Sequence, residues 1–189
     1  MKVLNINLTN EEKMMLEDEL VGIEYPTKNN DLYILEMNKV LYKYRTIFKD
    51  AIANRNLSFD KSGYSVIKFT NLPQDNNIQM PPTNYNHYTR IKKESYISEN
   101  ILVLIGLIFG EPYTMFNEGK GLVNNIIPLK KSTKNYTGEG SGVELGFHIE
   151  NNALRYFSYG DCSPKCLLLE GVKQQDTPHI HQYLMAEMH

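Results

Sequence analysis

Two residues that could bind a metal ion, His148 and Glu150, stand two positions apart in the segment GFHIE at 146–150. The hydrophobic alternation of 143–149 predicts a β-strand, and side chains two apart on a strand point to the same face. An imidazole and a carboxylate placed in this way can share one divalent cation, and a third ligand would complete the facial triad that binds non-haem Fe(II). His-x-Glu is also common by chance, so a half-buried histidine beside a solvated glutamate is the structural alternative.

The amino-acid composition indicates what kind of protein carries His148 and Glu150. The 189 residues suffice for one domain with a substantial core, and 41% hydrophobic with 22% charged residues is typical of a globular protein. A net charge of −2 without a long basic run argues against nucleic-acid binding. The longest apolar run, 101–109, is too short to span a bilayer, and no secretory signal begins the chain. We therefore expect a cytoplasmic protein that binds neither nucleic acid nor a membrane.

The only two cysteines, Cys162 and Cys166, form a single pair without the second Cys or His pair that a structural zinc site requires. We interpret them as free thiols in a reducing compartment.

Three helices are predicted. Thr9 and Glu12 form a capping box for the first, which should end near Gly22. The second should begin at Asn30 or Asp31 and continue to 54–56. Its core face is predicted from apolar spacings of three and four, or their sums: Leu32, Leu35, Leu41, Tyr44, Phe48 and Ala51.

The third helix should be capped by Ser98, Glu99 and Asn100 and stop at Gly110. Its apolar character on all sides predicts burial against a sheet.

Strands are predicted mainly in the later part of the chain. Alternation indicates a first strand at 64–69, followed by a long loop at 71–88 that could cover a pocket. Further strands are expected at 122–127 and 143–149, and 166–172 is typical of a fully buried strand. Helices before strands indicate an α+β fold, with a helical part at 1–60 and the strands in 61–189.

Several segments, taken in order, resemble the clavaminate synthase-like branch of the Fe(II)/2-oxoglutarate oxygenases. They lie at 63–69 with Leu72-Pro73, and at 110–113, 121–128, 145–151 and 166–173. The resemblance covers roughly residues 60–175, and its strength lies in the ordered set. It implies a double-stranded β-helix, or jelly-roll, core in 61–189 with one buried helix, and N-terminal helices packed outside.

The resemblance also implies a reaction and a set of site residues. The reaction is hydroxylation of an unactivated carbon in a free or carrier-bound amino acid similar to arginine, lysine or asparagine, with Fe(II) and 2-oxoglutarate. His148 and Glu150 would be metal ligands, Thr177 would contact 2-oxoglutarate, and Glu118 and Ser141 would contact the substrate. For Glu118 the structural alternative is a solvated loop residue, and for Ser141 a turn between glycines.

The chain departs from the family pattern after the metal motif. The distal histidine and the arginine that binds 2-oxoglutarate lie far downstream in the family, whereas only residues 151–189 follow Glu150 here. The C-terminal half of the jelly roll is therefore expected to be missing. His179, His181 or His189 could supply a third nitrogen, no arginine follows Arg155, and Lys173 is the last lysine of the sequence.

One alternative function follows from this departure, namely a truncated, catalytically silent half-fold that serves as a binding or assembly module or is a relic. A zinc hydrolase is a third alternative, because the His-x-Glu pair with the nearby His179 and His181 could hold zinc, although the spacing matches no zincin motif. Open sheet edges would favour a homo-oligomer or a complementing chain.

Overall fold

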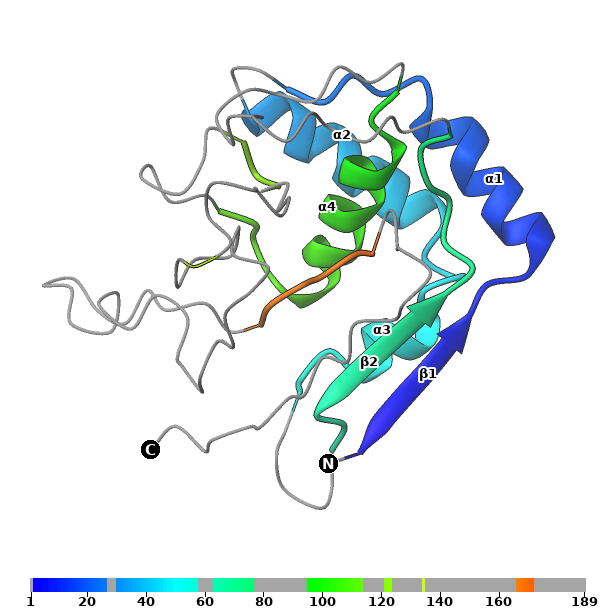
Figure 1. Ribbon diagram of the computed structural model, residues 1–189, viewed down its shortest axis with the longest axis vertical. Coiled ribbons are helices and arrows are strands. Elements are labelled where there is room, and N and C mark those ends of the chain that lie inside the picture. Colours follow the sequence, from blue (N-terminus) through cyan, green and yellow to red (C-terminus); the bar gives the residue numbers. More distant parts are fainter. Residues whose placement is uncertain are drawn as a thin grey trace, which may run out of the picture. The chain divides into compact units, whose positions relative to one another are not determined.

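The computed structural model describes residues 2–26, 30–57, 63–76, 95–113, 121–123, 134 and 166–171. Its elements are β1 (Val3–Asn7), α1 (Asn10–Leu20), α2 (Asn30–Lys43), α3 (Lys49–Ala53), β2 (Val66–Thr70) and α4 (Ile97–Phe109) (Figure 1). The described part thus mixes helices and strands. The double-stranded β-helix stays a prediction, because most of its expected strands lie outside these residues.

The chain divides into two compact units. The first comprises 1–79, 91–124 and 170–189 and contains all six elements. The second comprises 80–90 and 125–169, where the structure describes only residue 134 and 166–169, without a helix or strand. No helix in the described ranges is both long enough and apolar enough to cross a membrane.

Helix α1 begins as the sequence predicts. The Glu12 amide donates to Thr9 Oγ1 at 3.1 Å, and the Thr9 amide donates to a Glu12 carboxylate oxygen at 2.8 Å, so the capping box is confirmed. The helix ends at Leu20, shortly before Gly22, and buries Leu16 and Leu20.

The predicted second helix is two helices, and the prediction of one continuous helix is wrong. α2 ends at Lys43, a turn follows at 44–48, and α3 continues to Ala53 with Asn54 as its C-cap. The turn has the sequence YRTIF, in which aromatic and β-branched residues of low helix propensity predominate.

The predicted core face of this region is also partly wrong. Leu32 is 66% exposed and Leu35 is 54% exposed, whereas α2 buries Tyr33, Met37 and Val40. Tyr44, Phe48 and Ala51 are buried as predicted. Both faces of α2 carry apolar residues, so periodicity alone did not decide which one packs against α4.

The two strands form a parallel pair, with Val3 opposite Val66 and Asn7 opposite Thr70. A parallel pair needs a crossover connection, which α1, α2 and α3 supply. The predicted strand at 64–69 is confirmed as β2 with a small shift of its bounds. No element was predicted at β1. After β2, Asn71 adopts the left-handed backbone region (φ 59°). Its side-chain Nδ2 donates to Leu8 O at 2.8 Å.

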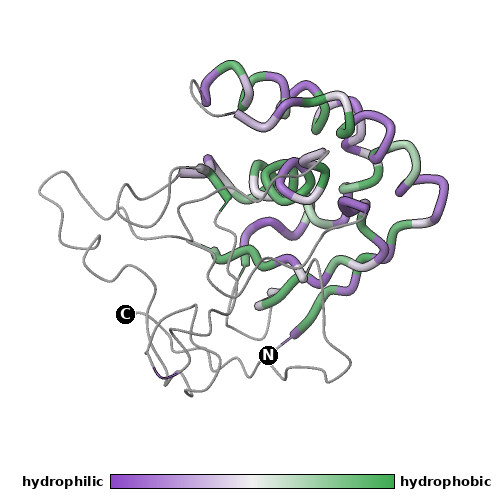
Figure 2. Tube along the Cα trace, turned by 45° about the horizontal axis from the view of Figure 1, so that its top comes forward, coloured by the Kyte–Doolittle hydropathy of each residue, from purple (hydrophilic) through white to green (hydrophobic). Residues whose placement is uncertain are grey.

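Helix α4 is the buried centre of the first unit. It contacts α1, α2 and α3, and hydrophobic residues predominate along it (Figure 2). Its end at Phe109 before Gly110 is confirmed, and so is its burial. Its main contacts among the described elements are with helices, and packing against a sheet stays a prediction, because most of the predicted later strands lie outside the described residues. Ser98, Glu99 and Asn100 lie inside the first turn and are buried, so they do not precede the helix as caps.

The later described segments carry no strand. Residues 121–123 form bends, and 166–171 have no regular structure. Leu167 and Leu169 are exposed, so the prediction of a fully buried strand at 166–172 is wrong for the six residues described. The predicted strand at 143–149 lies outside the described residues, as do 124–127 of the strand at 122–127 and 77–88 of the predicted loop.

Candidate functional site

All five predicted site residues lie outside the described residues: Glu118, Ser141, His148, Glu150 and Thr177. The same is true of the alternative ligands His179, His181 and His189, and of Lys173. The predicted iron site therefore stays a prediction. Four of the local arrangements formed by the described polar groups can be assessed for chemistry.

Tyr25 connects the helical part to one of the segments that carry the family resemblance. Its hydroxyl accepts a hydrogen bond from the Val123 amide at 2.7 Å. A Cβ added at Gly121 would lie 3.1 Å from the same hydroxyl oxygen, so the glycine permits a close approach. The Tyr25 ring is buried, stacks on Tyr96 and meets Tyr33 edge-on, with centroids 5.8 and 5.6 Å away. Tyr25 thereby fixes the position of 121–123.

A second arrangement centres on Asn100, whose side chain is fully buried in α4. Its amide nitrogen donates to the carbonyls of Leu20 and Ile23 at 3.1 and 2.9 Å. Its oxygen accepts from the Tyr33 hydroxyl at 2.8 Å. The last carbonyls of a helix lack partners within that helix, and Asn100 donates to that of Leu20, the last residue of α1, and to that of Ile23 in the turn after it.

Burial raises the pKa of Tyr33, and the nearby groups Tyr25, Glu99 and Glu36 raise it further. The phenol is therefore neutral at physiological pH and acts as a hydrogen-bond donor. These properties indicate a structural role in joining α1, α2 and α4.

The third arrangement caps α4 from a distant loop. Asp75 Oδ1 accepts from the Ile97 amide at 3.0 Å and from Ser95 Oγ at 2.6 Å, while Oδ2 accepts from the Ser98 amide at 3.2 Å. The Asp75 amide donates to Ser98 Oγ at 3.1 Å. A buried carboxylate at a helix N-terminus satisfies amides that lack partners and interacts favourably with the helix dipole. Asp75 thus defines where α4 begins.

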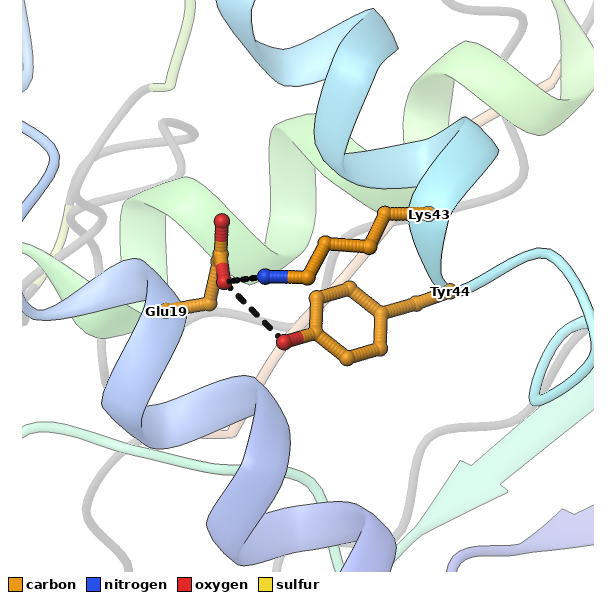
Figure 3. Close-up of polar contacts among 3 residues, drawn as sticks. All are labelled: Glu19, Lys43 and Tyr44. Carbon is orange, nitrogen blue, oxygen red and sulfur yellow. Dashed lines mark hydrogen bonds and ion pairs between the residues drawn. The ribbon is translucent and has the colours of Figure 1, made fainter.

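The fourth arrangement joins α1 to the end of α2 (Figure 3). One Glu19 carboxylate oxygen forms an ion pair with Lys43 and accepts from the Tyr44 hydroxyl at 3.0 Å. The Lys43 hydrogen bond, with a smaller contribution from Tyr44, lowers the pKa of Glu19 despite partial burial. Glu19 raises the pKa of Lys43 in return. Both groups are fully charged at neutral pH, so the contact is suited to linking helices and not to proton transfer.

Metal and thiol chemistry is limited within the described ranges. No three His, Cys, Asp or Glu side chains there gather closely enough to hold a metal ion. Cys166 is a half-buried free thiol, as predicted, and burial raises its pKa, which disfavours the nucleophilic thiolate. Cys162 lies outside the described residues.

Comparison with known proteins adds no relative: neither family models, curated proteins nor solved structures gave a match to this chain. The functional assignment therefore rests on the residues themselves.

Sequence reasoning missed the roles of Asp75, Asn100 and Tyr25. Asn100 did carry a signal, because an amide one turn into an apolar helix must find partners when it is buried. Asp75 is far along the chain from the Ile97 and Ser98 amides that it caps. No local capping pattern in the sequence therefore identifies it.

Proposed function

We propose that this chain is an Fe(II)/2-oxoglutarate-dependent oxygenase, or the part of one that carries the metal motif, and hydroxylates an amino acid or a carrier-bound amino acid. The observation that carries the proposal is the motif at 146–150, set among other family-like segments in the expected order. Strand β2 overlaps the segment 63–69, which resembles the family's first core strand.

His148 and Glu150 are the proposed metal ligands. A neutral imidazole and an ionised carboxylate are donors that suit Fe(II). Iron held by them would supply the redox chemistry of the hydroxylation. The protein's own groups would bind and orient the substrate, with Glu118 accepting hydrogen bonds from its amino group and Ser141 lining its pocket.

The proposal is tested by adding Fe(II) and 2-oxoglutarate to the protein without oxygen. We expect a visible metal-to-ligand charge-transfer band, together with release of succinate once oxygen is admitted. His148→Ala and Glu150→Ala should each abolish both signals. Glu11→Ala, which removes an exposed carboxylate in the first turn of α1, is the matched control and should leave them unchanged.

A protein that shows no band and binds Fe(II) equally well after His148→Ala would contradict the proposal. That result would favour the alternative of a catalytically silent binding or assembly module.

A further inference from the structure

Helix α2 has a second apolar face that the first unit does not bury. Tyr33, Met37 and Val40 point toward the core, but Leu32, Leu35 and Tyr42 are 66%, 54% and 70% exposed. Their spacings of three and seven place them along one side of the helix. We call these three residues the outer stripe. Single exposed apolar residues are ordinary, whereas several along one helix face are characteristic of an interaction surface.

The exposed charges beside the outer stripe are divided between the two halves of α2. Asp31 and Glu36 lie in the first half, and Lys39 and Lys43 lie in the second. This polarity favours the helix's own dipole. It also makes the helix complementary to a second copy of itself, provided that the two run antiparallel. In that arrangement the acidic first half of one helix lies beside the basic second half of the other copy.

Tyr42 has the properties of an interface anchor. The Arg45 guanidinium lies 4.3 Å from the centre of the Tyr42 ring and donates to the Tyr42 carbonyl at 2.8 Å. These contacts restrict the motion of an aromatic ring that is otherwise exposed. Tyrosine and arginine are enriched among residues that dominate binding energy, because they bury large areas and still form polar contacts.

We propose that the outer stripe of α2 binds a second copy of this chain, with the two helices antiparallel about a two-fold axis. Such an interface is self-complementary, as closed dimers require. A helix of 14 residues is only about 21 Å long, so the contact would be smaller than a standard interface of about 1,600 Å². The dimer should therefore be weak, dependent on protein concentration and weakened by salt.

Sedimentation equilibrium of the full chain over a range of concentrations tests the apolar part of the proposal. We expect a monomer–dimer equilibrium that the double variant Leu32→Gln/Leu35→Gln weakens by about tenfold or more, because burial of two leucines is lost. Met14→Gln, which changes an exposed apolar residue on α1, is the matched control and should leave the equilibrium unchanged. A monomer at every concentration, or an equal loss with Met14→Gln, would overturn the proposal.

Charge variants test the antiparallel pairing separately. Asp31→Lys/Glu36→Lys makes α2 basic along its length and should abolish self-association. An equimolar mixture with Lys39→Glu, which leaves the Lys43–Glu19 contact in place, should associate more tightly than either variant alone. Circular dichroism at 222 nm verifies that each variant is folded. A mixture that associates no better than its components would exclude α2 as the interface.

Discussion

At the residue scale, the described polar side chains mainly serve the fold. Asn100 donates to the Leu20 carbonyl at the end of α1 and to the Ile23 carbonyl in the turn after it, and orients the Tyr33 hydroxyl. A buried amide of this kind stabilises one arrangement of the surrounding helices, because any shift leaves several polar groups without partners. Its contribution is thus best measured by removing it.

Asn100→Ala should lower the free energy of unfolding by about 3 kcal/mol, since the Ile23 carbonyl and the Tyr33 hydroxyl lose the hydrogen bonds from Asn100 and the Leu20 carbonyl keeps only the bond from the Ile23 amide. Tyr33→Phe should cost about 1–2 kcal/mol, because only one hydrogen bond is lost. Urea unfolding followed by circular dichroism measures both. Asn38→Ala, at an exposed asparagine that bonds locally to Ile34, should change stability by less than about 0.5 kcal/mol. Equal effects of Asn100→Ala and Asn38→Ala would contradict the role given to Asn100.

At the element scale, long-range contacts decide where helices begin and end. The first turn of α4 has no capping side chain of its own at Tyr96, and Asp75 supplies the cap from the loop after β2. The helix and the loop therefore order each other. α1 shows the opposite case, because Thr9 and Glu12 cap it locally.

Asp75→Ala should destabilise the protein by about 1–2 kcal/mol, because the Ile97 and Ser98 amides lose their acceptor at a buried helix end. Asp75→Asn should cost less, since one oxygen acceptor is kept. Hydrogen exchange at the start of α4, measured by mass spectrometry, should increase in Asp75→Ala. Asp18→Ala, at an exposed aspartate in α1, is the control. Unchanged exchange at the start of α4 would show that Asp75 does not hold this end.

At the scale of the whole molecule, stability should depend on pH through the link between α1 and α2. The pKa of Glu19 is lower in the folded protein than in the unfolded chain, so its carboxylate stabilises the fold above its unfolded pKa. This contribution is lost as the pH falls through the lowered, folded pKa. Lys43 is exposed, so solvent and salt weaken the effect.

Glu19→Gln should therefore reduce stability at pH 7 by less than about 1 kcal/mol, and the difference from the unmodified protein should shrink as the pH falls through the lowered, folded pKa of Glu19. Unfolding can be followed at 222 nm, because all four described helices contribute to this signal. High salt should shrink the difference at pH 7. Glu11→Gln is the control, because it removes the charge of an exposed glutamate in the first turn of α1 that forms no ion pair with Lys43. A difference that does not shrink as the pH is lowered would mean that the Glu19 charge is not its cause.

The sequence by itself determined the features that depend on neighbours along the chain. The capping box of α1, the end of α4 at Gly110 and the strand β2 were all predicted, because the residues responsible lie within a few positions of one another. The sequence also supplies the only basis for the proposed iron ligands His148 and Glu150.

Only the tertiary structure decided features that depend on partners far along the chain. Apolar periodicity predicted that the face of α2 with Leu32 and Leu35 is buried. In the structure the opposite face is buried, because it packs against α4 and Tyr33 donates a hydrogen bond to Asn100. β1 became a strand by pairing with β2, more than fifty residues later. The local sequence pattern shows which apolar side chains a helix could bury. Which of its faces is buried depends on the element that packs against it, and this contact forms only when the chain folds.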